Sequence, residues 1–390
     1  MSNWPIVRVA DLVRIKHGHA FPGSDFSSDA AHPTLVTPGN FAIGGGFIQA
    51  NQKTFAGDYP SEFVLSPDSV IVTMTDLSKL GDTLGYSAVV PSEGTYLHNQ
   101  RIGLVEPAED ERVDLLFLNY LFRTPQYRAH VLGSATGSTV RHTSPSRIGD
   151  YAFRLPPLDE QRRIAGLLGS LDGLIDTNER LSTTCAELRR TIVRDSITEA
   201  TDQLPLSSVA RFVNGRNFTR VASGVGRPIV RTPEVRAGVS GSTLRSDTEA
   251  TEDNLATAGD ILMVWSGSLM LGRWSGEDAL VNQHIFKVIP NGWPDWLVYG
   301  WLERQLPWFL SLAADKATTM GHIQRAHLEA AVPIPTAGEI ERLGDQVDPL
   351  WRAELALAQE CADLRRVRNE LLPLLMSGLV RVTEVREIEA

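Results

Sequence analysis

One pattern of short motifs occurs twice in this chain of 390 residues, in the same order and at an offset of about 180–200 residues. Seven matched pairs make up the pattern: Arg14-Ile15-x-x-Gly18-x-x-Phe21 with Arg211-Phe212-x-x-Gly215-x-x-Phe218, Val36-Thr37-Pro38 with Arg231-Thr232-Pro233, Asp68-Ser69-Val70-Ile71-Val72 with Asp260-Ile261-Leu262-Met263-Val264, Asn99-Gln100-Arg101-Ile102 with Asn282-Gln283-His284-Ile285, Tyr120-Leu121-Phe122-Arg123 with Trp301-Leu302-Glu303-Arg304, Thr139-x-x-His142 with Thr319-x-x-His322, and Pro156 and Glu160 with Pro335 and Glu339. Each match is weak alone, but seven in one order indicate a duplication. Because the period is far longer than a solenoid repeat, each copy is predicted to be a domain.

Both copies have the same internal order of patterns. Short runs of β-branched and aromatic residues, separated by Gly, Pro, Asn and Asp, predict strands in the first two-thirds of each copy. A short helix is predicted next, within residues 114–125 and 296–307, and Pro125 and Pro307 are expected to end it. Each copy is therefore predicted to be a mixed, strand-rich globule.

A long amphipathic segment follows each globule. Residues 158–198 contain no proline and place Ile164, Leu168, Leu171 and Ile175 at heptad spacing, after which the seam weakens through Asn178 and Cys185 beside Leu181 and Leu188. The second segment is expected to be interrupted at Pro349 and Pro373, and its apolar positions are Ile340, Leu343, Val347, Leu350, Leu357, Cys361, Leu364, Leu371 and Leu375. One such segment alone could equally well be a core helix of an ordinary domain. Two such segments in matched positions favour helices that pair with each other. Asn178 either sets the register of that pair or lies at a solvated helix end.

The net charge of −10 argues at first against simple electrostatic binding of nucleic acid. The charge is unevenly distributed, however. The helical segments and C-terminal tail (156–202 and 336–390) hold 13 basic and 20 acidic side chains, whereas residues 203–335 hold 12 of each. Most of the net negative charge, −7 of −10, therefore lies outside the globules, where it suits protein partners better than phosphate.

Two windows inside the globules, at 115–149 and 203–233, contain no acidic residue but several arginines. An arginine-rich genome would explain the high ratio of Arg to Lys, but it does not explain acid-free windows. Because a guanidinium can bind phosphate or the edge of guanine with two hydrogen bonds, a nucleic-acid surface is predicted on each globule. The residues expected to face DNA are Arg14, Arg141, His142 and Arg147 in the first globule, and Arg211, Arg216, Arg220, His322 and Arg325 in the second.

Motifs of the common enzyme classes are absent from the sequence: there is no P-loop, dinucleotide-binding loop, zinc-protease helix, nucleophile elbow or Asn/Asp-Pro-Pro-aromatic run. Cys185 and Cys361 are too few for a disulfide framework and lack the context of a zinc site. We therefore expect no catalytic residue, no metal and no cofactor bound by this chain. The start of the sequence lacks a secretory pattern and no apolar run is long enough to span a bilayer, so a cytoplasmic protein without membrane contact is expected.

The segment Leu155-Pro156-Pro157-Leu158-Asp159-Glu160-Gln161-Arg162-Arg163-Ile164, with the LLGSLDGLIDTNERL that follows, resembles the shared helical region of type I restriction–modification specificity subunits. The resemblance extends over the whole chain, since globule–helix–globule–helix is also the layout of that family. The second copy departs from the motif, because the second Pro and the Gln are missing from Ile334-Pro335-Thr336-Ala337-Gly338-Glu339.

The resemblance implies an α+β fold with a pseudo-twofold internal repeat, in which two strand-rich target recognition domains are separated by long helices that pair as an antiparallel coiled coil. The expected segments are target recognition domain 1 (1–155), helical spacer 1 (156–202), target recognition domain 2 (203–335), helical spacer 2 (336–380) and a C-terminal tail (381–390).

The same resemblance implies a non-catalytic subunit that specifies a DNA sequence. Each domain would read one half of a bipartite site on double-stranded DNA, and the helices would set the spacer between the halves. Two modification subunits, which carry S-adenosylmethionine, would dock on the helices, and separate motor–nuclease subunits would complete the complex. The residues expected to bind these partners are Glu160, Gln161, Ile164, Leu168, Leu171, Ile175, Leu343, Val347 and Leu350.

The sequence is also compatible with two other functions. One is a duplicated protein-interaction scaffold in another defence or assembly complex, in which the basic windows are incidental. The other is an enzyme that uses His142 and His322, and it is disfavoured because no nucleophile or metal cluster accompanies them.

Overall fold

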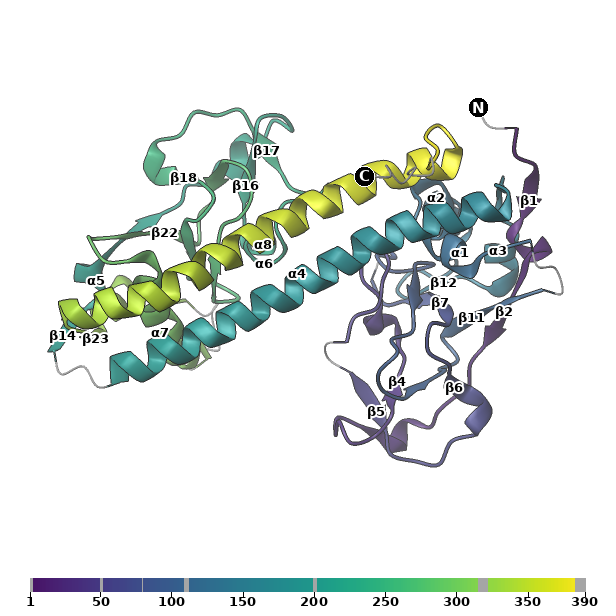
Figure 1. Ribbon diagram of the computed structural model, residues 1–390, viewed down its shortest axis with the longest axis horizontal. Helices are drawn as coiled ribbons and strands as arrows, with labels where there is room; N and C mark the ends of the chain where they lie inside the picture. The colour runs from purple at the N-terminus through teal and green to yellow at the C-terminus, as the bar shows by residue number, and fades with distance from the viewer. Residues whose placement is uncertain are drawn as a thin grey trace, which may run out of the picture. The chain divides into compact units, whose positions relative to one another are not determined.

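A computed structural model describes residues 3–49, 52–78, 80–108, 112–198, 202–314 and 322–382 (Figure 1). Thr319 of the repeated motif lies outside the described residues. The chain divides into two compact units, residues 1–172 with 366–390 (unit 1) and residues 173–365 (unit 2). Each unit contains one globule and a part of both long helices, α4 (Leu158–Thr198) and α8 (Ala337–Ser377).

Two sheets form the globule of unit 1. In the first sheet the strand order is β2-β11-β7-β9 and all neighbours are antiparallel. In the second the order is β3-β5-β4-β10-β6, with β4 and β10 parallel. The strands are β2 (Val13–His17), β11 (Ile102–Pro107), β7 (Val70–Thr73), β9 (Ser87–Val89), β3 (Phe26–Ser27), β5 (Lys53–Phe55), β4 (Thr34–Leu35), β10 (Tyr96–Leu97) and β6 (Val64–Leu65), with the shorter pairs β1 (Ile6–Arg8) and β13 (Ala152–Arg154), and β8 (Thr75–Asp76) and β12 (Arg141–His142).

The globule of unit 2 repeats this topology. Its antiparallel sheet has the order β15-β22-β19-β20, and its second sheet has the order β17-β16-β21-β18, in which β16 and β21 are parallel as β4 and β10 are in unit 1. The strands are β15 (Ala210–Asn214), β22 (Ile285–Pro290), β19 (Ile261–Val264), β20 (Met270–Arg273), β17 (Arg245–Ser246), β16 (Arg227–Val230), β21 (Ala279–Val281) and β18 (Leu255–Ala256), with the pair β14 (Asp202–Pro205) and β23 (Ala331–Ile334). β4, β7, β9, β11, β16, β19 and β22 fall in the runs whose composition predicts strands, and the predicted duplication is confirmed at the level of strand order.

The helices that follow the strands differ between the copies. In unit 1, α1 (Leu115–Leu121) ends before Pro125, which starts α2 (Pro125–Ser134), and α3 (Pro145–Gly149) comes later. Unit 2 contains α5 (Leu206–Val209), α6 (Thr232–Ala237) and α7 (Asp295–Ala314). The expected end of the helix at Pro307 is wrong, because α7 continues through it. Phe309 beyond the proline is fully buried in the core, and this packing offsets the missing backbone hydrogen bond.

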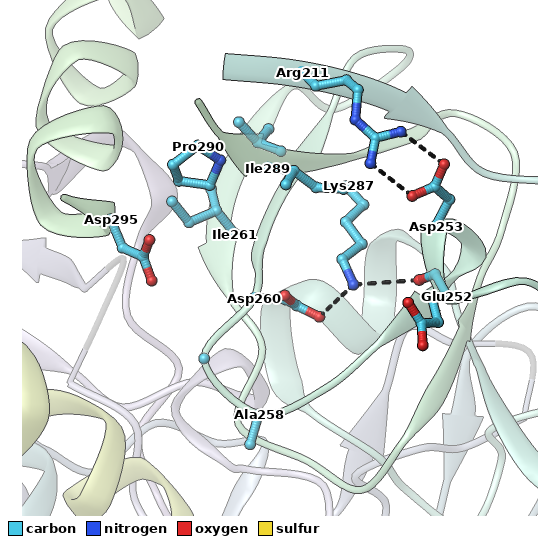
Figure 2. A pocket seen from close by; sticks show the side chains of 12 residues that line it. Arg211, Glu252, Asp253, Ala258, Asp260, Ile261, Lys287, Ile289, Pro290 and Asp295 are labelled. Carbon is cyan, nitrogen blue, oxygen red and sulfur yellow. Dashed lines mark hydrogen bonds and ion pairs between the residues drawn. The ribbon is translucent and has the colours of Figure 1, made fainter. Parts of the chain in front are cut away.

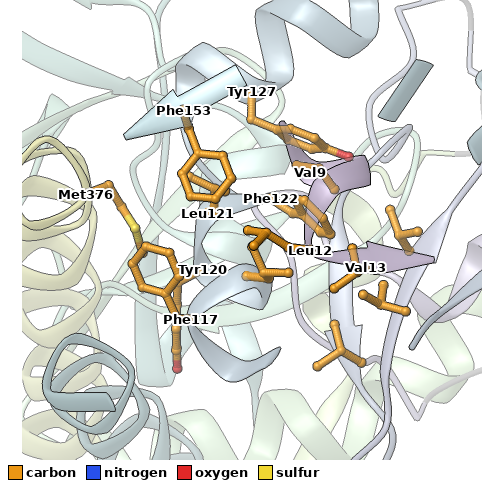
Figure 3. Close-up of a cluster of buried hydrophobic side chains, with 14 of the residues drawn as sticks. Val9, Leu12, Val13, Phe117, Tyr120, Leu121, Phe122, Tyr127, Phe153 and Met376 are labelled. Atoms are coloured by element: carbon orange, nitrogen blue, oxygen red, sulfur yellow. The ribbon is translucent and has the colours of Figure 1, made fainter. Parts of the chain in front are cut away.

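The core of unit 1 gathers side chains from the globule and from both long helices. Figure 3 shows part of it, with Met376 of α8 among side chains of the globule. Phe117 and Phe122, in and just after α1, are fully buried, and Ile164 of α4 and Met376 of α8 belong to the same cluster. Each such side chain contributes about 1.5–3 kcal/mol by leaving water. The long helices are therefore part of the core of the domain.

Unit 2 has the equivalent core. Trp296 and Trp301 of α7 pack there with Val193 of α4 and Val347 of α8. A Cβ on Gly300 of α7 would lie 2.8 Å from the side chain of Val193, so the glycine allows α7 to approach α4 closely. No helix among the described residues has the length and apolarity that crossing a membrane requires.

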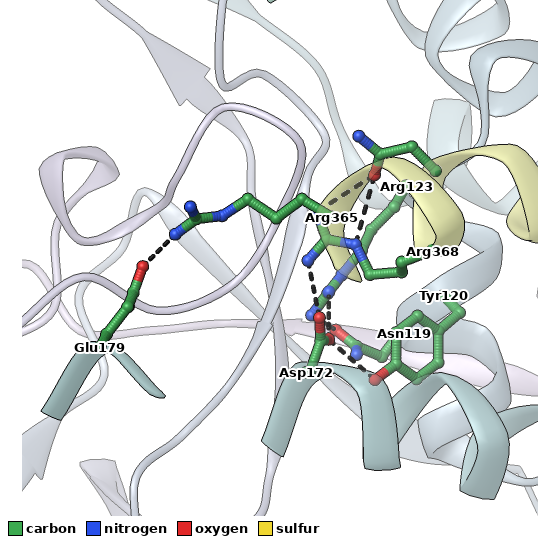
Figure 4. A network of polar contacts seen from close by, with 8 residues as sticks. Asn119, Tyr120, Arg123, Asp172, Glu179, Arg365 and Arg368 are labelled. Carbon is green, nitrogen blue, oxygen red and sulfur yellow. Dashed lines mark hydrogen bonds and ion pairs between the residues drawn. The ribbon is translucent and has the colours of Figure 1, made fainter. Parts of the chain in front are cut away.

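Within both units α4 and α8 lie side by side and antiparallel (Figure 1). In unit 1, Arg368 of α8 donates to Asp172 of α4 at 2.6 Å, and in unit 2 Arg365 pairs with Glu179 (Figure 4). Further along unit 2, Arg189 donates to Glu354 at 2.8 Å, so higher numbers on α4 meet lower numbers on α8. The predicted antiparallel pair of helices is confirmed.

Three details of the predicted helices are wrong. Neither Pro349 nor Pro373 interrupts α8, whose neighbouring side chains Trp351, Leu372 and Leu375 are buried in the cores. Leu181 and Leu188, expected beside the seam, are exposed. The buried face of α4 keeps heptad spacing but passes through polar side chains, at Asn178 and Arg189.

Candidate nucleic-acid interface

In unit 1 the Gly-x-x-Phe motif after β2 crosses the Asn-Gln motif before β11. The backbone N–H of His19 donates to the carbonyl of His98 at 2.8 Å, and the N–H of Gln100 donates to the carbonyl of His19 at 2.9 Å. A Cβ on Gly18 would lie 2.2 Å from the His98 carbonyl oxygen. Glycine is therefore required at position 18 because the two backbones approach too closely for a side chain.

The same crossing occurs in unit 2. The N–H of Arg216 donates to the carbonyl of Val281 at 3.1 Å, and the N–H of Gln283 donates to the carbonyl of Arg216 at 2.9 Å. A Cβ on Gly215 would lie 2.2 Å from the carbonyl oxygen of Asn282. Two of the sequence motifs that revealed the duplication are thus the two sides of one backbone contact, formed once in each globule.

Two further segments extend this contact in unit 1. The N–H of Met74 donates to the carbonyl of Arg101, and the N–H of Thr143 donates to the carbonyl of Met74, both at 3.0 Å. β12 pairs with β8 here, so that Nδ1 of His142 lies 3.2 Å from the hydroxyl of Thr75. The order across the surface is Gly18–His19, Asn99–Arg101, Met74–Thr75 and His142–Thr143.

Unit 2 builds the same extension from different residues. The N–H of Trp265 donates to the carbonyl of His284, and the N–H of Ile323 donates to the carbonyl of Trp265, both at 3.0 Å. Ser266 forms a bridge with His322, as Thr75 does with His142 in unit 1. The predicted correspondence of His142 with His322 is confirmed by their identical places in this arrangement.

We call each of these arrangements a four-segment surface. The unit 1 surface consists of residues 18–19, 99–101, 74–75 and 142–143, and the unit 2 surface consists of residues 215–216, 282–284, 265–266 and 322–323. The backbone hydrogen bonds of both surfaces are satisfied within the globule, so the side chains are held in fixed positions but stay available. Those exposed to solvent are Gln100, Arg101 and His142 in unit 1, and Arg216 and His284 in unit 2.

Arg147, one of the predicted site residues, joins the unit 1 surface through Thr136. Its guanidinium donates to the Thr136 hydroxyl at 3.3 Å, while the Thr136 and His142 backbones exchange hydrogen bonds of 3.0 and 2.8 Å. Arg141 lies on β12 opposite Asp76 of β8. The structure therefore brings Arg141, His142 and Arg147 together, as the sequence predicts.

Asp76 lies opposite Arg141 in the β8–β12 pair, and its carboxylate is bound by its own loop. Burial by itself would raise the pKa of Asp76, but hydrogen bonds from the backbones of Ser78 and Thr83 and from the Thr83 hydroxyl outweigh it and lower the pKa below its usual value. The Asp76 carboxylate stays ionised and already has three donors. It organises the loop and leaves His142 and Arg147 to face an anion.

The other predicted site residues of unit 2 are distributed more widely. Arg216 lies on the four-segment surface, Arg220 is exposed in the short turn of helix Phe218–Val221, and Arg325 is exposed three residues beyond His322. In the described part of the chain the guanidinium groups of Arg216, Arg220 and Arg325 make no ion pair or hydrogen bond, so all three remain available to phosphate.

Arg14 and Arg211 occupy matched strands and are not brought to these surfaces. Arg14 lies on β2 opposite Glu106. Arg211 makes two hydrogen bonds to Asp253, at 2.7 and 2.8 Å, on the wall of a cavity of about 400 Å³ (Figure 2). Glu252, Asp260 and Asp295 also line this cavity, so its acidic lining does not suit phosphate.

Two arginines of the first acid-free window belong to the interior. Arg128 is buried, donates to the carbonyl of Gly81 at 2.8 Å and stacks 3.9 Å from the ring of Tyr86. Arg123 donates to Asp172 of α4 at 3.0 Å. These two arginines are not among the residues expected to face DNA, and the structure engages them inside unit 1, because their acceptors come from distant parts of the chain.

The residues expected to bind partners through the helices are mostly enclosed by this chain. Gln161 is buried and satisfied, since its amide accepts from the N–H of Asp114 and donates to the carbonyls of Arg112 and Pro156, each at 2.9 Å. Glu160 is buried beside Arg163. Ile164, Leu168, Ile175, Leu343 and Val347 are buried too, whereas Leu171 and Leu350 are half-buried. Any partner must contact other faces of the helices.

Sequence reasoning missed Arg101, His284 and Trp265 as site residues. The signal was available for the first two, since both follow the repeated Asn-Gln motif. Trp265 could not be identified, because its counterpart Met74 has a different side chain and only the backbone contact is shared. Among the described residues, no group of three or more His, Cys, Asp or Glu side chains is arranged to hold a metal ion.

Comparison with known proteins identifies relatives of both the sequence and the fold. Residues 1–184 match a family model described as the type I restriction modification DNA specificity domain. The EcoBI specificity subunit of Escherichia coli, a type I restriction enzyme subunit, is 26% identical over 179 residues, which are 46% of this chain and 34% of that subunit. The chain thus matches about a third of the length of this relative.

The fold has a solved counterpart. The crystal structure of the type I restriction–modification system S subunit from M. genitalium matches with a TM-score of 0.59, covering 96% of each chain at 14% sequence identity. This likeness concerns the fold, whereas the family match concerns the sequence of the first globule and most of α4. The first 184 residues are thus similar to a type I restriction modification DNA specificity domain, and the fold of the chain is similar to that of a solved type I S subunit.

Proposed function

We propose that this chain is the DNA sequence-specificity subunit of a type I restriction–modification complex and has no catalytic role of its own. Each globule reads one half of a bipartite site on double-stranded DNA, and the paired helices set the distance between the halves and dock two modification subunits. The observation that carries the proposal is the four-segment surface, which recurs in both globules with the same backbone and different exposed side chains.

The chemistry of these surfaces fits a duplex. Arg147 and His142 in unit 1, and Arg216 and Arg220 in unit 2, offer donors to phosphate, and the exposed amide of Gln100 offers both a donor and an acceptor to a base edge. A shared backbone with changed side chains is what two different half-sites require. A scaffold for protein partners would have no need of unpaired guanidinium groups.

Salt-dependent binding of the assembled complex to duplex DNA tests this proposal. Affinity for a bipartite site should fall steeply between about 50 and 200 mM salt, and it should exceed the affinity for unrelated duplex at every salt concentration. Binding without a salt slope and without sequence preference would favour the protein-interaction scaffold. Methylome sequencing of the host with and without the chain then identifies the site.

The paired helices are proposed to act as the ruler between the half-sites. One heptad inserted in both α4 and α8, at matched places of the antiparallel pair, adds about 10 Å of helix. The spacer of the recognised site should then grow by about three base pairs, given about 34 Å per turn of duplex, while both half-sites stay the same. The matched control is a heptad in α4 alone, which should destabilise the pair. An unchanged spacer in the double insertion would contradict the ruler.

The docking face for modification subunits is proposed to be an exposed leucine stripe on α4. Leu174, Leu181 and Leu188 follow one another at heptad spacing and are 49%, 50% and 49% exposed. Because the buried seam of α4 is already used within this chain, such a second apolar stripe is typical of a helix that joins a larger bundle. The modification subunit would bring the S-adenosylmethionine that methylation requires. Separate motor–nuclease subunits would complete the complex.

Substituting a leucine of the exposed stripe tests whether this face, and not the buried seam of α4, binds the modification subunit. Leu181→Glu should leave the thermal unfolding of the chain nearly unchanged and should abolish co-purification with the modification subunit. Thr184→Glu, at an exposed position of the same helix, is the matched control and should leave the complex intact. Assembly that survives both changes would place the docking face elsewhere.

A further inference from the structure

The tip of the Asn-Gln turn occupies equivalent positions in the two four-segment surfaces and differs in its side chain and in its φ, which is positive at His284 and not at Arg101. Arg101 holds this position in unit 1 and His284 holds it in unit 2. In each, the carbonyl accepts a hydrogen bond of 3.0 Å from the next segment, from Met74 or from Trp265. Both side chains are exposed. The backbone is therefore fixed while the side chain projects from a position common to the two globules.

His284 carries a conformational cost that the fold does not require. Its φ is +74°, and Asp68 is the other described non-glycine residue with a positive φ. Glycine adopts this conformation freely, whereas a residue with a side chain pays about 1–3 kcal/mol of strain there. Strain of this kind is often found at functional sites. A histidine at an exposed, left-handed position indicates that its ring has a use.

The ring of His284 also has a rigid support. It lies 5.2 Å from the ring of Trp265, which stacks on Phe286 at 5.6 Å and donates from Nε1 to the side-chain oxygen of Asn214 at 2.9 Å. The imidazole therefore lies against a tryptophan that is itself packed and hydrogen-bonded, which narrows the directions the exposed ring can take.

Arg101 has the opposite character. In the described part of the chain its guanidinium makes no hydrogen bond or ion pair, and it is free to present two parallel donors. A guanidinium with two free donors matches O6 and N7 of guanine in the major groove, whereas one imidazole donor matches a single purine acceptor.

We infer that Arg101 and His284 are equivalent base-reading residues, and that each determines the preferred base at one position of its half-site. Arg101 selects guanine, and His284 selects a purine by donating one hydrogen bond to it. The inference rests on the proposed function, since it assigns the reading residues of the same DNA-binding surfaces.

The test uses the complex assembled with modification subunits and duplexes selected from a random library. Arg101→Ala should reduce discrimination at one position of one half-site by about 10- to 100-fold, and His284→Gly should do the same in the other half-site. His284→Gly should leave the unfolding temperature unchanged or higher, because glycine relieves the positive φ. Asp68→Gly relieves the same conformation elsewhere and is the matched control, with no effect on any base preference.

The outcomes separate the inference from the proposed function. If wild-type complex shows no sequence preference, the proposed function fails. If preference persists at every position in both variants, or if they weaken all sequences alike as phosphate contacts would, the inference is wrong and the proposed function stands. Should His284→Gly fail to fold, His284→Asn, which tolerates the left-handed backbone, replaces it and should lose the same preference. Arg101→His should change the preferred base at one position only.

Discussion

Each unit anchors the long helices with a cluster of ion pairs, and the charge at the centre of the cluster is negative in unit 1 and positive in unit 2. In unit 1 a single carboxylate on α4, Asp172, lies between two arginines, with Arg123 of the globule at 3.0 Å and Arg368 of α8 at 2.6 Å (Figure 4). In unit 2 a single arginine on α4, Arg189, lies between two carboxylates, Glu303 of α7 and Glu354 of α8, both at 2.8 Å.

This inversion separates what the duplication preserves from what it leaves free. Each cluster joins one globule helix, α4 and α8 within its own unit, and each pairs the central charge with two opposite charges. An aromatic ring also lies beside each cluster, Tyr120 against Arg123 and Tyr299 against Arg189. In both anchors one central charge on α4 is paired with two opposite charges, whereas the sign of the central charge differs, because the attraction between unlike charges does not depend on which sign is central.

The largest expected effect comes from removing the centre of the unit 2 anchor. Arg189 is 1% exposed, so Arg189→Leu removes the buried partner of both Glu303 and Glu354 and leaves Glu303 paired only with the exposed Arg190. We expect a loss of about 3–5 kcal/mol in the free energy of unfolding. Denaturant unfolding measures the loss, and hydrogen exchange should show it in peptides of unit 2 first.

Arg190→Leu is the matched control for this change. Arg190 also donates to Glu303 at 2.8 Å, but it is largely exposed. Its loss should cost less than about 1 kcal/mol. Equal effects of Arg189→Leu and Arg190→Leu would show that burial of the anchor does not determine its contribution.

A smaller effect is expected in unit 1. Asp172→Asn keeps a hydrogen-bond acceptor for the Tyr120 hydroxyl but leaves the buried Arg123 without a negative partner. Since Asp172 and Arg368 are less buried than Arg189, we expect a loss of about 2–3 kcal/mol. Asp176→Asn on the same helix, which breaks an exposed pair with Arg180, should change stability by less than about 0.5 kcal/mol. A cost for Asp172→Asn as small as that of the control would refute the anchor in unit 1.

The two anchors should also respond differently to acid. Burial alone would raise the pKa of Asp172, but Arg123 and Arg368 outweigh it and hold that pKa below its usual value. The stabilisation that ionised Asp172 gives the folded state is therefore present at neutral pH and is lost as pH falls below about 4. Burial raises the pKa of Glu354 despite Arg189, so ionising Glu354 opposes folding. The stability gap between wild type and Asp172→Asn should therefore narrow as pH falls below about 4, whereas Glu354→Gln should show no such narrowing; thermal unfolding from neutral to acid pH measures both.

The outline of the fold could be predicted because local signals and global packing agree. Heptad spacing, proline-free runs and repeated motifs located both long helices and the strand runs. The failures have physical causes: Pro307 and Pro349 look like breakers, but helices continue through them where buried residues such as Phe309 and Trp351 hold the next turn. Local pattern does not contain that tertiary packing energy.

The candidate site was predicted less completely for a related reason. Arg123 and Arg128 stand in an acid-free stretch of sequence, yet Asp172 and the carbonyl of Gly81 reach them from distant segments. Arg101 and His284 were visible as part of a repeat, but their exposure depends on how four separate segments cross. Sequence windows report which charges are neighbours along the chain, not which are neighbours in space.

The smallest expected effect concerns the part of the α4 seam in unit 2, where the polar side chains of Asn178 and Arg189 interrupt the apolar Ile175 and Val193. Asn178 is 7% exposed on this face, and its amide nitrogen makes no hydrogen bond in the described part of the chain. Asn178→Leu should therefore raise the free energy of unfolding by about 1 kcal/mol, because it replaces an unsatisfied buried amide with an apolar side chain. Thr177→Leu, at the neighbouring exposed position, should give no such gain. A buried Asn typically trades stability for a single register, so Asn178→Leu should also broaden the distribution of α4–α8 spin-label distances in unit 2. A gain in stability with an unchanged, narrow distribution would mean that the anchor at Arg189 sets the register alone.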